Sequence, residues 1–155
     1  MGVDTRELQG FDDLIRKLRA VVPAMRKRVI RNALAAGGRI VRDEAKRLAP
    51  VLQNPTPYRT RGLLKKSLTV RTSKVARRAG DVGVFVNVKP LKVGRGAKNP
   101  RDPYYWSFVN FGTKKMAARP FLSKAADKLP QALNVFKTKI GEWFAKTERS
   151  GKVTP

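Results

Sequence analysis

The sequence contains no cysteine and no histidine among its 155 residues. Their absence excludes disulfide bonds, thiolate nucleophiles and imidazole bases, and it removes the usual ligands of zinc. No apolar run approaches the roughly 20 residues that cross a bilayer. The first residues include Asp4, Glu7, Asp12 and Asp13 and lack the apolar stretch of a secretory signal. We therefore expect a soluble protein or a component of an assembly.

Acidic residues are scarce. The chain has 11 Asp and Glu against 35 Lys and Arg, which gives a formal net charge of +24 at pH 7. Such self-repulsion opposes compaction unless a polyanion or an acidic partner lies nearby. Asp81 is the only acid between Glu44 and Asp102, and that stretch carries fifteen Lys and Arg. The middle of the chain is therefore the cationic region and predicts an anionic partner.

The few acids do not form a catalytic pattern. A paired-carboxylate site needs two acids in one cleft, whereas Asp12, Asp13, Asp43 and Glu44 fall on predicted helix surfaces. Residues 94–98 superficially suggest a phosphate-binding loop, but they lack its Gly-Lys-Ser/Thr ending and its strand-loop-helix context. We expect no enzyme, and hence no catalytic residue, metal site or cofactor.

Three segments have helical periodicity. Apolar residues recur at helical spacing from Leu8 to Val21, and Pro23 ends that pattern and can begin a second helix that runs to Pro50. Small residues at 33–38 permit close helix contact, although each Gly costs about 1 kcal/mol relative to Ala. A final helix starts at Pro120, and Pro130 kinks or divides it. Its expected inward side carries Phe121, Leu122, Ala125, Leu129, Leu133, Phe136, Ile140, Trp143 and Phe144.

The strands are grouped in the middle of the chain. Residues 67–72 and 82–88 alternate at strand period, and 71–81 between them is too long for a tight turn, which predicts a mobile basic loop. Residues 89–103 predict a second flexible basic loop with almost nothing to bury, and 51–62 also read as a loop. Residues 104–111 fit either a third strand or a short helix.

This order predicts an α+β fold, because the strands do not alternate with helices. We expect a small antiparallel β-sheet packed against N-terminal helices and a C-terminal helix, with long basic loops. One domain should span residues 1–155, with flexible tails at 1–7 and 147–155.

The two basic loops are the candidate binding site. Phosphate binding needs accessible Lys and Arg and is independent of base sequence. A merely solvated surface is the alternative, and no motif for sequence-specific readout is present. The aromatic residues of 104–111 offer stacking surfaces for bases, but we favour core packing for them. The candidate basic residues are Lys74, Arg77, Arg78, Lys89, Lys92, Arg95, Lys98 and Arg101.

The most specific segment follows these loops. Gly112 permits a sharp reversal, Pro120 presets a helix start, and Phe121 anchors that start in the core. The sequence of residues 105–113 and 116–122 resembles the tail-component family named after gene product ten of phage HK97. The motif residues in these two segments are Phe111, Gly112, Thr113, Arg119, Pro120 and Phe121. That family comprises head–tail joining or tail-completion proteins of long-tailed phages. The resemblance also covers residues 11–14, 45–50 and 62–68 and extends to the last helix.

Two departures accompany the resemblance. Asn110 stands where the family often has an acid, so a salt bridge made by that acid is in doubt here. Against the family pattern, the connection from Pro50 to Gly62 looks lengthened by residues 53–58. We expect these residues to form a contact loop of this protein's own.

The resemblance implies a structural virion protein, made in the host bacterial cytoplasm and placed in the neck of a tailed phage. The implied assembly is a homo-oligomeric ring of six subunits between the head–tail connector and the tail tube or terminator protein, with genomic DNA in its lumen. The basic loops would face DNA or acidic neighbours, and residues 111–113 would hold core and subunit contacts. The alternative is a free, sequence-nonspecific nucleic-acid-binding protein. An enzyme acting on nucleic acid has the least support.

Overall fold

The computed structural model describes residues 15–16, 19 and 23–149. Most of the helix predicted from Leu8 to Val21 lies outside the described residues, although Ile15, Arg16 and Arg19 are helical. The predicted tail at 1–7 also lies outside them. The long helix α2 (Pro23–Leu48) follows, as the sequence predicts.

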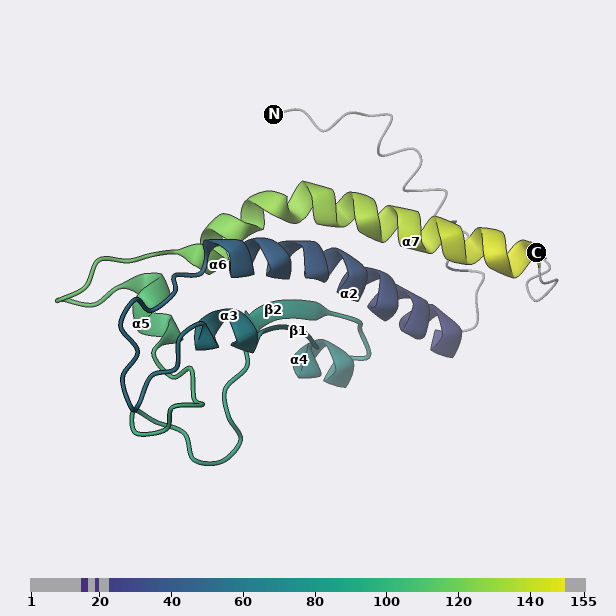
Figure 1. Ribbon diagram of the computed structural model, residues 1–155. Coiled ribbons are helices and arrows are strands. Elements are labelled where there is room, and N and C mark those ends of the chain that lie inside the picture. The colour runs from purple at the N-terminus through teal and green to yellow at the C-terminus, as the bar shows by residue number, and fades with distance from the viewer. Residues whose placement is uncertain (1–14, 17–18, 20–22, 150–155) are drawn as a thin grey trace.

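Helix α2 forms the middle layer of the molecule (Figure 1). Helix α7 (Leu129–Arg149) packs along one side of it, and the sheet of β1 (Leu68–Thr72) and β2 (Val84–Val88) packs on another. The two strands are antiparallel, with Leu68 opposite Val88 and Thr72 opposite Val84. The predicted α+β fold with a small antiparallel sheet is confirmed.

The small residues of α2 allow α7 to approach closely. Ala33 is buried against Ile140 and Phe144 of α7. A Cβ atom added to Gly37 would lie 2.5 Å from the backbone oxygen of Ala132, and real Cβ atoms do not approach that closely. This confirms the close helix contact that residues 33–38 predict.

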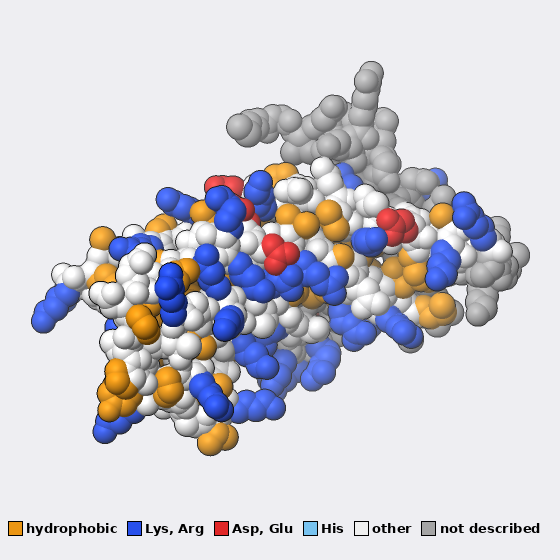
Figure 2. All heavy atoms as spheres, viewed as in Figure 1, with side chains coloured by type: hydrophobic (Ala, Val, Ile, Leu, Met, Phe, Trp, Pro, Cys, Tyr) orange, Lys and Arg blue, Asp and Glu red, His pale blue; other side chains and the backbone are white. Residues whose placement is uncertain are grey.

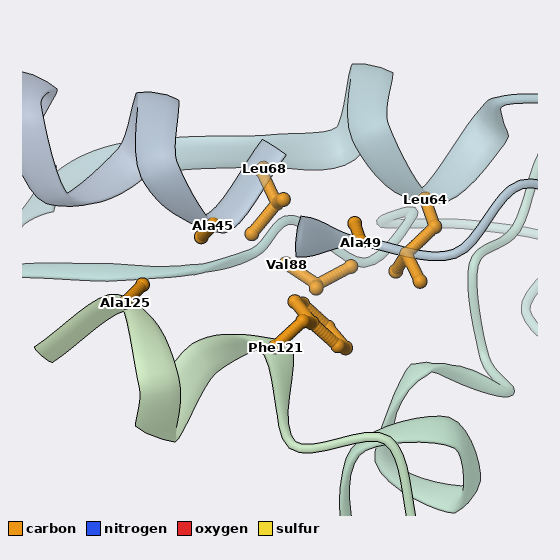
Figure 3. Close-up of a cluster of buried hydrophobic side chains, with 7 residues drawn as sticks. All are labelled: Ala45, Ala49, Leu64, Leu68, Val88, Phe121 and Ala125. Carbon is orange, nitrogen blue, oxygen red and sulfur yellow. The ribbon is translucent and has the colours of Figure 1, made fainter. Parts of the chain in front are cut away.

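A second apolar cluster joins the sheet to the C-terminal end of α2 (Figure 3). Phe121 is its largest member and is 2% exposed. Its ring projects among the side chains of Leu64, Val88 and Ala49. The start of α6 (Phe121–Ala125) is therefore packed against the sheet and against α3 (Leu63–Ser67). The cluster comprises Ala45, Ala49, Leu64, Leu68, Val88, Phe121 and Ala125.

The C-terminal helix is divided just before Pro130, as the sequence predicts. The 3-10 turn η1 (Ala126–Lys128) separates α6 from α7. A 3-10 turn advances about 120° per residue against about 100° in an α-helix, so the apolar stripe shifts around the axis. The predicted inward positions are accordingly wrong for Leu129 and Leu133, which are 57% and 47% exposed. Helix α7 runs on through Thr147, which the sequence assigns to the tail; its hydroxyl donates to the Trp143 oxygen at 2.7 Å.

The first predicted basic loop is wrong in its local structure, because it contains helix α4 (Lys74–Arg78). Ser73 precedes this helix, and its hydroxyl accepts a hydrogen bond from the Ala76 N–H at 3.2 Å. A serine in this position satisfies an N–H group that has no partner inside the helix. Three of the predicted basic residues therefore lie on a short helix between the strands.

The second predicted basic loop has no helix or strand, but the expectation that it buries almost nothing is wrong. Asp102 is 2% exposed, and its carboxylate accepts hydrogen bonds from the N–H groups of Gly96 at 2.7 Å and Leu91 at 3.4 Å. The adjacent Pro103 is also buried. The loop is folded around a buried carboxylate that holds two of its backbone segments.

The structure also decides between strand and helix for residues 104–111 and tests the loop predicted at 51–62. Residues 104–111 form a short helix, α5 (Trp106–Phe111), and no third strand. Residues 51–62 form a loop, as predicted, which includes an isolated bridge between Thr56 and Arg59.

Candidate anion-binding groove

The structure separates the predicted basic residues into two places. Lys74, Arg77 and Arg78 lie on α4, at the end of the sheet where β1 leads into β2 (Figure 1). The other five, between Lys89 and Arg101, follow β2 at the opposite end of the sheet. All eight are exposed. The two segments are thus accessible, as a binding role requires, but they do not form a single site.

A basic groove connects these two places. It has a volume of ≈ 450 Å³ and runs along β1, which lines it from Leu68 to Thr72. Figure 2 shows Lys and Arg side chains gathered in a band along α2 and below it. The cations that line the groove are Arg39, Arg42 and Lys46 from α2, with Lys66 and Arg71 from the segment that contains β1.

Helical and strand periodicity place these side chains together. Arg39, Arg42 and Lys46 are spaced three and four residues apart, so they project from one face of α2. The outer edge of β1 borders that face, because β1 pairs only with β2 in the two-stranded sheet. The sequence analysis missed this site. The signal that it contained was the basic stripe on α2, but only packing showed that the stripe faces a strand edge.

The cations of the groove are largely uncompensated. Arg42 pairs with Asp43 at 2.7 Å. Within the described part of the chain, Arg39, Lys46, Lys66 and Arg71 have no carboxylate within 4.0 Å. The guanidinium of Arg71 instead lies over the ring of Phe85, 5.8 Å from its centroid. Four fixed positive charges are therefore available to an anion.

The groove extends into a longer cationic track. The backbone N–H of Lys89 donates to the Ser67 oxygen at 2.8 Å, which places the second basic loop next to Lys66. At the other end, Lys74 follows β1 by two residues. A strand of five residues spans about 17 Å. The track suits an extended anion, and the unpaired backbone edge of β1 offers additional N–H donors.

A separate ion pair lies farther along α2. Both guanidinium nitrogens of Arg47 that face Glu44 donate to its carboxylate, at 2.6 and 2.9 Å. The hydrogen bonds lower the pKa of Glu44 and raise the pKa of Arg47. Glu44 therefore stays charged and ion-paired with Arg47, and its carboxylate does not neutralise the cations of the groove.

The family motif forms a compact turn rather than a binding site. Gly112 has a φ of 79°, and a Cβ atom there would lie 2.9 Å from the Met116 oxygen and from the Ala118 nitrogen. Only glycine fits such a reversal without strain. The Arg119 N–H donates to the Val109 oxygen at 2.8 Å and closes the turn against α5. Thr113 and Met116 pair at its tip.

The aromatic residues of α5 are divided between the core and the surface. Tyr105, Trp106 and Val109 pack against the second apolar cluster. Phe108 is 49% exposed and Phe111 is 71% exposed, so the expected core packing is wrong for these two. A helix of six residues turns only one side to the core. The exposed rings of α5 instead form an apolar end of the molecule.

Tyr105 lines a small hollow under the long connection of residues 51–62. The hollow has a volume of ≈ 270 Å³ and is also lined by Leu52, Met116 and Arg119. Burial raises the pKa of Tyr105. The Arg59 guanidinium lies 5.9 Å from the centroid of its ring. The loop of residues 51–62 therefore borders the family motif at Tyr105 and Arg119.

Asn110 has a role that the sequence analysis missed. It is 2% exposed, and its side-chain oxygen accepts a hydrogen bond from the Leu122 N–H at 3.1 Å. Leu122 is the second residue of α6, so the side chain satisfies an N–H group at the start of that helix. An acid at this position can accept the same bond, and no salt bridge is needed.

Asn110→Ala is expected to lower the free energy of unfolding by about 1–2 kcal/mol, because a buried donor loses its acceptor. Asn110→Asp keeps an acceptor oxygen and should lose less. Urea denaturation of both variants tests this. Equal losses for the two would contradict the capping role.

Two general properties bear on function. Among the described residues no three His, Cys, Asp or Glu side chains gather where they could hold a metal ion. The described helices include none with the length and apolarity to span a membrane.

The family comparison decides the identity. A family model described as "Bacteriophage HK97-gp10, putative tail-component" matches residues 12–112, which is 101 of the 155 residues. The chain belongs to the HK97-gp10-like family. The matched range contains α2, the sheet, both basic segments and α5. No curated protein and no solved structure gave a significant match.

Membership of the HK97-gp10-like family gives the coarse function. The chain is a phage tail component, which implies a place in the virion and contact with other virion proteins. Membership of this family is consistent with a structural role and with the absence of a catalytic pattern in the sequence. The match ends at Gly112, so Arg119, Pro120 and Phe121 lie outside the matched range although the sequence resemblance includes them.

Proposed function

We propose that this tail component completes the head-proximal end of the tail, where copies of the chain, six in the ring that we favour, surround the DNA channel. The groove along β1 carries the proposal. It holds four uncompensated cations on rigid elements and continues into basic segments at both ends. In such a ring the groove faces the lumen and the connector, tail-tube or terminator proteins contact the remaining surfaces.

The position of the cations suits DNA that must move. Contacts between Lys or Arg and phosphate attract DNA whatever its base sequence. In this proposal the cations contact phosphates and no base edges, so the groove offers attraction without fixing the register. DNA that passes through the ring can exchange one phosphate for the next.

Rigid placement favours the groove over the loops as the main contact. Arg39 and Lys46 project from a helix of 26 residues, and Lys66 and Arg71 flank or belong to a strand. Backbone that is already held in a helix or strand loses little conformational entropy when its cations bind. The residues of α4 and of 89–101 then extend the contact at either end.

DNA binding by the purified protein tests the groove. Each lost phosphate contact should reduce the slope of log K against log salt by about 0.9 for duplex DNA, so four losses should reduce it by about 3.6. The groove variant is Arg39→Gln, Lys46→Gln, Lys66→Gln and Arg71→Gln. The control removes the same charge elsewhere, through Lys114→Gln, Lys115→Gln, Lys124→Gln and Lys146→Gln.

Only the groove variant should show the large reduction in slope. Equal slopes for the two variants would mean that binding depends on net charge alone. Tight DNA binding by a wild-type monomer that never enters particles would favour the free nucleic-acid-binding protein instead. Electron microscopy of intact particles provides the spatial test, since a lumenal groove must lie within about 10 Å of DNA to act unscreened. A groove that faces away from the channel would overturn the proposal.

A further inference from the structure

The hollow under residues 51–62 has the composition of a small docking site. Its volume is ≈ 270 Å³, and most of its lining side chains are apolar, among them Leu52, Leu64 and Val109. A cavity of about 150 Å³ holds one benzene ring, so the hollow accepts a single large apolar side chain. Met116, which also lines the hollow, is 41% exposed, so solvent reaches it. The proposed DNA contact makes no use of this hollow.

Two guanidinium groups border the hollow. Arg59 and Arg119 both line it, and both residues are exposed. Within the described part of the chain, neither has a carboxylate within 4.0 Å. An arginine fork binds a carboxylate through two parallel N–H donors. The hollow thus combines apolar walls with two positive groups that lack an anion.

The backbone and ring contacts of Arg59 hold it beside the hollow. Its guanidinium donates to the Tyr104 hydroxyl at 3.4 Å and lies 5.9 Å from the centroid of the Tyr105 ring. The hydroxyl of the next residue, Thr60, donates to the Pro100 oxygen at 2.9 Å. The loop is therefore tied to the segment that leads into α5, and Arg59 is placed before any partner binds.

Arg119 is the one residue of the motif 119–121 whose side chain the fold does not use. Phe121 fills the core and Pro120 precedes α6, whereas the side chain of Arg119 is exposed. The Arg119 N–H donates to the Val109 oxygen at 2.8 Å, and a residue before proline is confined to extended conformations. The backbone therefore fixes Arg119 at the hollow, and its charge is available to a ligand.

The surroundings of the hollow favour a peptide carboxylate over DNA. Nonspecific DNA binding uses cations spread along many phosphates, but residues 48–58, which border the hollow, contain no Lys or Arg. A phosphodiester backbone also has no apolar side chain that could fill the hollow. An Asp or Glu next to a large apolar residue matches both the arginines and the apolar walls.

Charge also favours a different protein over a second copy of this chain. Two copies that each carry a net charge of +24 repel one another. The described part of the chain contains seven acids, of which three are ion-paired and Asp102 is buried. Only Asp81, Asp127 and Glu148 remain in that part. Family membership implies contact with other virion proteins, and an acidic one supplies the charge that a second copy lacks.

We infer that the hollow binds a segment of a neighbouring virion protein in which an Asp or Glu lies next to a large apolar residue. The carboxylate binds between Arg59 and Arg119, and the apolar side chain enters the hollow against Leu52. The inference goes beyond the proposed DNA contact. It rests on the place in the virion that family membership gives and does not require the basic groove.

Photo-cross-linking in intact particles identifies the occupant. The photoreactive residue p-benzoylphenylalanine is introduced in place of Gln53, which lines the hollow and is exposed. The expected product joins this chain to a segment of a different virion protein that contains an acid beside a Leu, Ile, Met or Phe. The matched control carries the same residue in place of Val93, which is 86% exposed and lies outside the hollow, and should not give that product.

Charge reversal tests the two arginines. Arg59→Glu combined with Arg119→Glu should reduce incorporation of the chain into particles at least about tenfold, because like charges then face each other in a desolvated contact. Arg61→Glu combined with Lys114→Glu is the matched control, since both residues are exposed and lie outside the hollow. It makes the same change in net charge and should be incorporated normally.

A second charge reversal, in the partner, gives the decisive result. Changing the cross-linked acid of the partner to Lys should restore incorporation of the variant Arg59→Glu, Arg119→Glu. Restoration shows both that this variant is folded and that the contact is direct. The cross-link itself is formed by a chain that keeps both arginines, so it does not depend on the folding of the reversed variant.

Several outcomes overturn the inference. They are a cross-link to another copy of this chain, a cross-linked segment without an acid, normal incorporation of the reversed variant, and a loss that Lys in the partner does not restore. A slope of log K against log salt lower by about 1.8 than in the control would assign the two arginines to DNA phosphates instead. Failure here is distinct from failure of the proposed function, because no cation of the basic groove lines the hollow.

Discussion

Phe121→Ala should lower the free energy of unfolding by about 3–5 kcal/mol, the usual loss when a fully buried aromatic ring is removed. Phe121 is 2% exposed and is the largest side chain in the cluster that joins α2, α3, the sheet and α6. Alanine would leave a cavity among the side chains of α2, α3, β1, β2 and α6 that make up this cluster. Urea denaturation followed by tryptophan fluorescence measures the change, because Trp106 packs against the same cluster.

Phe111→Ala provides the control for this measurement. The same atoms are deleted, but Phe111 is 71% exposed and lies in the family motif ten residues before Phe121. Its loss should stay near 0.5 kcal/mol, as for most surface substitutions. Similar losses for the two variants would contradict the anchoring role of Phe121. A domain of ordinary stability, about 5–15 kcal/mol, would lose a large part of it only through Phe121→Ala.

Gly37→Ala should destabilise the protein by about 1–3 kcal/mol, in spite of the better helix propensity of alanine. The added methyl group would lie 2.5 Å from the Ala132 oxygen, which is a backbone atom and cannot rotate away. Helices α2 and α7 would have to separate, and the contacts of Ala33 with Ile140 and Phe144 would loosen with them.

Gly141→Ala is the matched control, because Gly141 lies inside α7 and a Cβ atom there meets nothing within 4 Å. This variant should gain about 0.5–1 kcal/mol from helix propensity. Opposite signs for the two substitutions would show that Gly37 is required by packing. A gain in both would mean that α7 lies farther from α2 than the structure places it.

The two outer edges of the sheet have different chemistry, and this difference organises the molecule. The β1 edge borders the basic stripe of α2, and the β2 edge borders apolar residues of α2 and α7. A two-stranded sheet leaves both edges open. One edge therefore suits an anionic ligand, and the other offers an apolar surface.

Some functional residues were hidden from sequence reasoning for a physical reason. Arg39, Arg42 and Lys46 look like ordinary solvated helix charges until the strand edge beside them is known. Asp102 looks like a solvated acid in a polar loop, but it is buried and holds the Gly96 backbone. In each case the role depends on what lies within a few ångströms, and that neighbour is distant in the sequence.

The sequence by itself determined the class of the protein. Helical and strand periodicity gave α2, both strands and the division at Pro130, because these signals depend only on residues a few positions apart. The charge imbalance predicted an anionic partner. The ordered motifs from residue 11 to residue 122 carried the resemblance to the phage tail-component family, which the family match confirms.

Only the tertiary structure decided where the charges and the apolar surfaces lie. The fold placed the two basic segments at opposite ends of the sheet and joined them through a groove that the sequence does not mark. It exposed Leu129 and Leu133 beside β2, because the 3-10 turn changes the phase of the helix. Such surfaces arise from contacts between segments far apart in the chain, whose relative positions no local pattern records.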